Sequence, residues 1–177
     1  MPSTRAAYIL RKSSGYTLIE LIIVMAMMAL LGTTLVAVVG SGGNQYQRIH
    51  ENYSTENEAR IALSYMTVKI RQNDTYITDP VYTGRSVTVL AGPPPVLQIR
   101  DSATSRWDIQ LVGNQLVESR YTAGSPTPDA TATISDKISA LSIASDATGS
   151  LITIDITYVV DGNAKHLIEK VYLRSDG

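Results

Sequence analysis

The longest apolar run of this chain lies near its N-terminus, from Tyr16 to Val39, and Glu20 is its only charged residue. About 20 apolar residues form a helix long enough to cross the hydrocarbon core of a bilayer, so this run predicts a transmembrane helix. A charged residue inside such a helix costs about 2.5–3.5 kcal/mol on insertion scales, and one that is tolerated there is a candidate functional residue. The simpler alternative is a plain anchor whose Glu20 lies at the level of the lipid headgroups.

Three glycines follow the apolar run, in the segment from Gly40 to Gly43. Each glycine costs a helix about 1 kcal/mol relative to alanine, so we expect a bend, a melted segment or a hinge there, or a turn at the membrane surface. Asn44 can cap a second helix, which we expect to extend to about Gln72 because this segment contains neither glycine nor proline. Its apolar residues share one face, which should pack on a sheet: Ala59, Ala62, Leu63, Met66 and Ile70.

After Asp74 the hydrophobic period changes from 3.6 to 2, which indicates strands. We expect them at residues 85–90, 96–100, 107–112, 115–121, 134–143, 151–160 and 166–173. Turn signals stand at Gly113–Asn114 and Asp161–Asn163, and the Ser-, Thr- and Pro-rich residues 123–133 read as a surface loop. The chain is therefore predicted to be α+β. Its long N-terminal helix should have a membrane-spanning half and a half packed on an antiparallel β-sheet within residues 76–173.

The composition and the motifs of the chain exclude several kinds of binding site and catalysis. The net charge of −1 gives no electrostatic footprint for nucleic acid across the whole chain, and the absence of cysteine excludes disulfides, zinc–thiolate sites and thiol catalysis. His50 and His166 lie in dissimilar contexts and are interpreted as surface or edge residues, and Trp107 as a half-buried strand residue. The turn at Asp161–Asn163 has too few oxygen donors for calcium. With no catalytic triad spacing and no phosphate-binding glycine loop, we expect no enzyme activity, cofactor or metal.

Basic residues precede the apolar run, and they predict its orientation. Arg5, Arg11 and Lys12 lie on the N-terminal side, whereas residues 40–47 carry no charge. The positive-inside rule then leaves the N-terminus in the cytoplasm and exports the remainder, which is of single-domain size. An ordinary secretory signal has a shorter apolar region and a small-residue cleavage site, and the run found here is longer and ends without one.

The stretch Arg11-Lys-Ser-Ser-Gly15-Tyr16-Thr-Leu-Ile-Glu20, with the apolar run after it, resembles the class III signal of type IV pilins and pseudopilins. The resemblance implies that residues 1–15 are a leader, that a prepilin peptidase/N-methyltransferase cleaves between Gly15 and Tyr16, and that it methylates Tyr16. It also implies that Glu20 directs filament assembly by pairing with the N-terminal amine of a neighbouring subunit. The chain departs from the family pattern at Tyr16, where most members have phenylalanine, also an aromatic residue.

A second resemblance lies in the exported head, residues 44–177. Residues 58–72 and the stretch from Trp107 to Arg120 are similar to J-class pseudopilins and W-class minor pilins. This implies a pilin-like fold and a minor subunit of a type IV pilus, a competence pilus or a type II secretion pseudopilus. Such a subunit would sit in the inner membrane before it joins other pilin subunits through an inner-membrane assembly platform. Two alternatives stay open: a filament-tip adhesive or DNA-binding pilin, contacting its ligand through loops near Pro93 and Pro126, and an anchored domain outside any filament.

Overall fold

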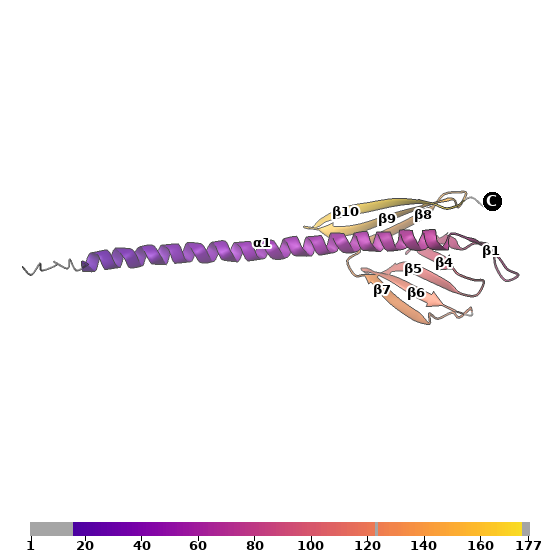
Figure 1. The fold of residues 1–177 in the computed structure, drawn as a ribbon, viewed down its shortest axis with the longest axis horizontal. Helices are drawn as coiled ribbons and strands as arrows, with labels where there is room; N and C mark the ends of the chain where they lie inside the picture. The colour runs from indigo at the N-terminus through magenta and orange to yellow at the C-terminus, as the bar shows by residue number, and fades with distance from the viewer. Residues whose placement is uncertain (1–15, 123, 175–177) are drawn as a thin grey trace, which may run out of the picture. The chain divides into compact units, whose positions relative to one another are not determined.

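The computed structural model describes residues 16–122 and 124–174 of the chain, and Figure 1 shows the fold. The chain divides into two compact units between Gln47 and Arg48. One helix, α1 (Leu18–Asn73), contributes residues to both units, and every strand belongs to the second. The fold is α+β, with a long N-terminal helix followed by antiparallel sheets, as predicted for a pilin-like chain.

The predicted interruption of the helix by the glycine segment is wrong, since α1 continues through residues 40–43 and no second helix starts at Asn44. The helix continues through the glycines because helix formation is cooperative. Restarting a helix after a break carries a nucleation factor of about 10⁻³, equivalent to roughly 4 kcal/mol, whereas three glycines cost about 3 kcal/mol. A position of easier bending at residues 40–43 stays a prediction.

The part of the head that lies in the second unit, residues 48–174 of the described chain, contains three antiparallel sheets. A small sheet pairs β1 (Tyr76–Thr78) with β2 (Thr83–Arg85). A five-stranded sheet follows in chain order: β3 (Val87–Leu90), β4 (Val96–Arg100), β5 (Arg106–Val112), β6 (Gln115–Tyr121) and β7 (Ala130–Ser135). A three-stranded sheet has the order β10-β9-β8, from β8 (Ala140–Ser145), β9 (Leu151–Val160) and β10 (Asn163–Tyr172).

Most predicted strands are confirmed, and β4, β6 and β9 have the predicted bounds. The single strand expected at residues 134–143 is wrong, because this region contains the end of β7 and the start of β8. Residues 130–133 were expected in a loop but belong to β7. The first four side chains of this strand are exposed, and main-chain pairing with β6 holds it in place. The turn after β9 is confirmed at Asp161 and Gly162, both with positive φ, but Asn163 begins β10.

The hydrophobic core of the head lies between one face of the last turns of α1 and the two larger sheets, which appear above and below the helix in the view of Figure 1. The predicted packing face is confirmed: Ala59, Ala62, Met66 and Ile70 are fully buried, and Leu63 packs at the edge of the core. Small side chains at two of these positions let the helix backbone approach the sheets closely. Facing residues come from both sheets, among them Leu97, Ile99, Ile109, Leu116, Ile152, Ile154 and Ile156. Trp107 is half-buried beside this core, as predicted.

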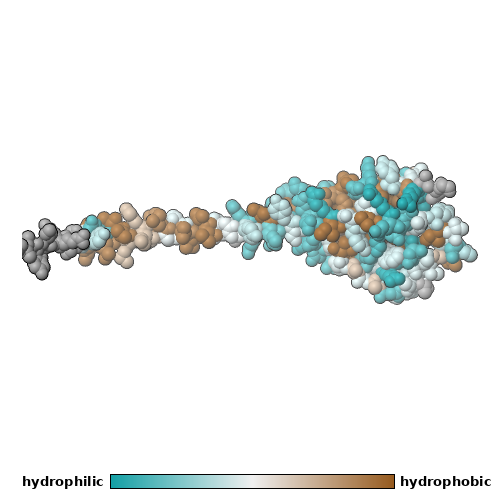
Figure 2. All heavy atoms as spheres, in the orientation of Figure 1, coloured by the Kyte–Doolittle hydropathy of each residue, from teal (hydrophilic) through white to brown (hydrophobic). Residues whose placement is uncertain are grey.

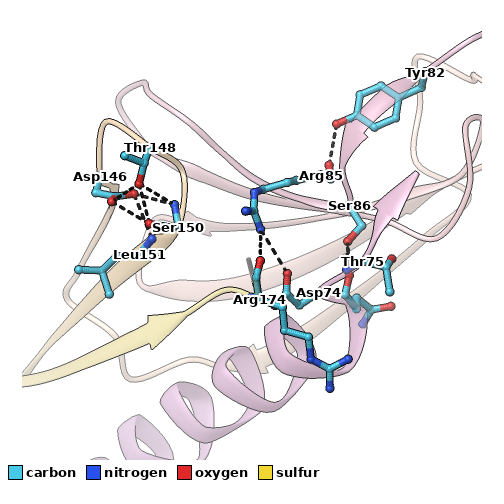
Figure 3. A network of polar contacts seen from close by, with 11 residues as sticks. Asp74, Thr75, Tyr82, Arg85, Ser86, Asp146, Thr148, Ser150, Leu151 and Arg174 are labelled. Carbon is cyan, nitrogen blue, oxygen red and sulfur yellow. Dashed lines mark hydrogen bonds and ion pairs between the residues drawn. The ribbon is translucent and has the colours of Figure 1, made fainter. Parts of the chain in front are cut away.

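A buried carboxylate ties the end of α1 to two distant segments (Figure 3). Asp74 is 8% exposed, and its Oδ2 accepts the backbone N–H of Arg174 at 2.5 Å. Its Oδ1 lies 3.7 Å from Nη1 of Arg85, which donates to the Arg174 carbonyl at 3.0 Å. The end of the helix, strand β2 and the chain after β10 are therefore joined at one charged group.

A second carboxylate closes the turn between β8 and β9 (Figure 3). The side chain of Asp146 accepts the Thr148 hydroxyl at 2.5 Å, the Ser150 backbone N–H at 2.8 Å and the Leu151 backbone N–H at 3.0 Å. These hydrogen bonds favour the ionised form, and they lower the pKa of Asp146 to about 2, the Thr148 hydroxyl contributing most. The ionised carboxylate therefore stabilises this turn.

Candidate functional site

The first turn of α1 is closed by a reciprocal capping arrangement between Thr17 and Glu20. The Thr17 hydroxyl accepts the Glu20 backbone N–H at 3.4 Å, and Glu20 Oε2 accepts the Thr17 backbone N–H at 3.0 Å. Oε2 also accepts the Thr17 hydroxyl at 3.1 Å. A threonine at the N-cap and a glutamate three residues later form a capping box, which satisfies backbone donors that the helix itself cannot.

This arrangement changes the expected state of the Glu20 carboxylate. The sequence predicted a carboxylate that needs an external partner, yet one of its oxygens is already satisfied by its own chain. The other oxygen, Oε1, accepts no hydrogen bond from any residue in the described part of the chain. The negative charge lies at the positive end of the helix dipole, and among the described residues no cationic side chain is paired with it. The capping box therefore fixes the carboxylate at the helix start and leaves one oxygen for another donor.

The helix that follows exposes its apolar side chains all round. Within the first unit, the described side chains from Tyr16 to Gly43 are exposed, and Figure 2 shows the apolar surface along the first part of α1. This part is long and apolar enough to cross a membrane. Twelve Leu, Ile and Val residues between Leu18 and Val39 contribute about 4–7 kcal/mol of insertion free energy, which exceeds the cost of one charged residue.

The hydroxyl groups of the span are satisfied internally. Thr33 and Thr34 donate to the Leu30 and Leu31 carbonyls at 2.9 Å each, so neither presents a bare donor to lipid or to a neighbouring helix. Within the described part of the span, Glu20 is the one charged side chain, and its Oε1 accepts no hydrogen bond from a described residue. A surface with one such group can be recognised at one position along the helix.

The other predicted site residues are placed only in part. Gly15, Arg11 and Lys12 lie outside the described residues, as does the rest of the leader. Tyr16 precedes α1 and is 88% exposed. Cleavage at Gly15/Tyr16, methylation of Tyr16 and the orientation given by the basic residues therefore stay predictions. Sequence reasoning missed Thr17, although the pattern Thr-x-x-Glu before an apolar run is a known helix-start signal.

The two histidines lie on the surface, as predicted. His166 Nδ1 lies 3.2 Å from Oδ1 of Asp155 and 3.3 Å from the Thr157 hydroxyl, on the exposed face of the three-stranded sheet. Among the described residues, no group of three or more His, Cys, Asp or Glu side chains is placed to hold a metal ion. The histidine contacts are those of a polar sheet surface.

A cationic cluster joins α1 to the five-stranded sheet. Lys69 Nζ forms an ion pair with Glu118 and lies 4.9 Å from the centroid of the Trp107 ring. The Tyr65 hydroxyl donates to the other oxygen of Glu118 at 2.9 Å, and partial burial raises the pKa of Tyr65, which keeps this donor protonated. Arg120 lies over the same Trp107 ring at 5.7 Å. These residues belong to the two head segments that resemble the J and W classes, and they contact one another.

Comparison with known proteins finds a match near the N-terminus of the chain. Residues 10–38 match the family described as the prokaryotic N-terminal methylation motif. The match extends across Gly15, Tyr16 and Glu20 and covers most of the apolar run. It supports a type IV pilin-like precursor that is anchored by its N-terminal helix. The comparison with curated proteins found no match, and neither did the comparison with solved structures.

Proposed function

We propose that this chain is a minor pilin or pseudopilin, a structural subunit of a type IV pilus, competence pilus or type II secretion pseudopilus. Prepilin peptidase removes residues 1–15 by cutting between Gly15 and Tyr16, and Tyr16 is then methylated. One observation carries the proposal. The methylation motif at residues 10–38 coincides with an exposed apolar helix that has a single carboxylate, fixed in its first turn.

The chemistry of assembly follows from the state of Glu20. Cleavage creates a new α-amine on Tyr16, and this amine stays cationic at neutral pH. When the helix leaves the bilayer and packs among the helices of a filament, its carboxylate enters a low-dielectric surrounding where an uncompensated charge is costly. The amine of a neighbouring subunit supplies the missing cation, and the unused Oε1 supplies the acceptor. Cleavage must precede assembly because the uncut precursor has no amine at Tyr16.

The position in the membrane follows from the same helix. Arg11 and Lys12 stay on the cytoplasmic side, and the head is exported across the inner membrane. An inner-membrane assembly platform and further pilin subunits then receive the processed chain. The polar surface of the head supports this placement in an aqueous compartment (Figure 2).

The assignment to a minor subunit of the J or W class depends on the head. Support comes from the contacts of the residues that carry the resemblance. Ala59 and Ala62 are fully buried against the sheets, and Lys69 lies beside Trp107. The residues that resemble the J and W classes therefore include those that pack α1 against the sheets of the head.

Replacement of Glu20 by leucine tests the proposed role in assembly. The variant E20L should remain in the membrane fraction, since the substitution removes the one charge of the apolar run, and it should be absent from sheared filaments. T34L is a matched control because Thr34 is another polar residue of the span, and it should be incorporated normally. The variant G15V should accumulate at the size of the uncut precursor. Recovery of E20L in filaments at the wild-type level would refute the role of Glu20.

A further inference from the structure

Two arginines stand opposite each other on the outer face of the five-stranded sheet. Arg100, at the end of β4, pairs directly with Arg106, at the start of β5. Directly opposed residues of antiparallel strands project on the same side, and alternation places this side opposite to the buried Ile99. Like charges at such a pair destabilise the strands unless other groups compensate for them.

Each guanidinium group is held in place by an aromatic ring. The Arg100 guanidinium lies 4.5 Å from the centroid of the Tyr82 ring, and that of Arg106 lies 4.2 Å from the centroid of Tyr121. The Tyr82 hydroxyl donates to the Arg85 carbonyl at 2.7 Å, which fixes the ring (Figure 3). A guanidinium stacked on a fixed ring has lost much of its rotational freedom before any ligand arrives.

The neighbouring groups accept hydrogen bonds from only some of the N–H donors of Arg100 and Arg106. Among residues 16–122 and 124–174, Asp108 is the one carboxylate in contact with the two arginines. Its Oδ2 accepts from Arg106 Nε at 3.3 Å, and its Oδ1 accepts from the Gln98 amide at 3.1 Å. The Gln98 carbonyl accepts from Arg100 Nη2 at 3.1 Å. Arg100 Nε is buried without a partner, and the terminal nitrogens of Arg106 donate to no residue in the described ranges. The cluster therefore carries one excess positive charge, and its unused donors outside the buried Arg100 Nε are the terminal nitrogens of Arg106, whose side chain is 25% exposed.

The charge of this cluster decides the class of ligand. One excess positive charge matches the single negative charge of a carboxylate, whose two oxygens accept parallel N–H groups of a guanidinium. A nucleic acid is held instead by many phosphate contacts along a basic surface, and this chain has 15 basic and 16 acidic residues. An acidic side chain on a partner protein is the ligand that this balance favours.

We propose that Arg100 and Arg106 form a docking site for a carboxylate side chain of a partner protein. That the partner is another filament subunit is an additional claim that rests on the proposed function. The two tyrosine rings and Gln98 orient the guanidinium groups, and the incoming carboxylate supplies the acceptor that the cluster lacks.

The site is tested by titration of the full-length protein in detergent micelles with short peptides. Arginine is labelled with ¹⁵N, and the Nε–H signals are followed as acetyl-Gly-Glu-Gly-amide is added. The glutamine version of the peptide is the control for the charge. The glutamate peptide should shift the signals of Arg100 and Arg106 saturably, and the glutamine peptide should not. In R106Q the affinity should fall at least about tenfold, whereas R120Q, on the opposite face of the sheet, should bind as wild type.

Three results would overturn parts of this proposal. Equal shifts with both peptides, or in both variants, would show that Arg100 and Arg106 bind no carboxylate. Inorganic phosphate binding at least about tenfold more tightly than the glutamate peptide would assign the site to phosphate. Normal incorporation of R106Q into filaments, together with lost peptide binding, would refute a filament subunit as the partner. The peptide titration needs no filament, so its outcome is independent of the E20L test.

Discussion

Truncation of a buried isoleucine of α1 should destabilise the head far more than the same truncation on the opposite side of the helix. Ile70 is 0% exposed, and Ile61 is 54% exposed. Nine residues separate them, which at 3.6 residues per turn places them about 180° apart. Because both changes are Ile→Ala in one helix, the gain in helix propensity is the same and cancels in the comparison.

The size of the difference follows from the burial. Ile→Ala at a fully buried position costs about 2–5 kcal/mol, from lost transfer free energy and the cavity left behind, whereas exposed substitutions stay within about 0.5 kcal/mol. With an m-value of about 2 kcal/mol/M, a cost in the middle of this range places the urea midpoint of I70A roughly 2 M below that of I61A.

Fluorescence of the one tryptophan provides the assay, because Trp107 packs beside Lys69 of α1 and reports on the contact between helix and sheet. Unfolding is followed in urea at constant detergent concentration. Equal midpoints for I70A and I61A would refute the conclusion that the inward face of α1 stabilises the head.

Three further outcomes follow from single contacts. The folded-state pKa of Asp146, about 2, lies below its ordinary value of 3.8, so its stabilisation is present above pH 4 and is lost as the pH falls through 2. The stability difference between wild type and D146N, measured by urea unfolding, should therefore shrink between pH 5 and pH 2; a constant difference would contradict this. E118Q leaves a largely buried ammonium group without its carboxylate and should cost about 1–3 kcal/mol in unfolding free energy. E56Q, in a solvent-exposed pair, should cost under about 0.5 kcal/mol, and equal costs would refute the difference in burial. T17V removes the N-cap hydroxyl and should weaken the first turn by about 0.5–2 kcal/mol. Amide exchange of the Glu20 N–H in micelles should be faster in T17V, and unchanged exchange would exclude the capping role.

The sequence predicts those elements whose side chains have one buried face. The stripe that contains Met66 and Ile70 repeats at the helical period, and Ile152, Ile154 and Ile156 alternate along β9. In both cases burial selects the residue type, so the period is visible in the sequence. Strand β7 lacks this signal because its side chains are mostly exposed and its position depends on main-chain bonds to β6.

Local propensity alone misled the prediction at the glycine segment. Gly40 and Gly43 disfavour a helix individually, yet residues on both sides are strongly helical and the helix continues between them. The Asp74 contacts could not be predicted either, because the carboxylate meets a backbone N–H 100 residues further along the chain.

Both residues of the capping box at the start of α1 can be found from the sequence, although only Glu20 was predicted. Glu20 is conspicuous as a lone charge in an apolar run, and Thr17 could have been found from the Thr-x-x-Glu pattern.

The pairing of Arg100 with Arg106 could not be predicted. It depends on the register between β4 and β5 across an irregular loop, and hydrophobic alternation does not determine this register.

Mass analysis of the protein recovered from sheared filaments tests the central claim most directly. The account predicts a chain that begins at Tyr16 and carries one additional methyl group on its N-terminal amine. The uncut precursor should occur only in the membrane fraction. Filaments that contain a chain with residues 1–15 still attached, or that contain other pilins but never this one, would contradict the account.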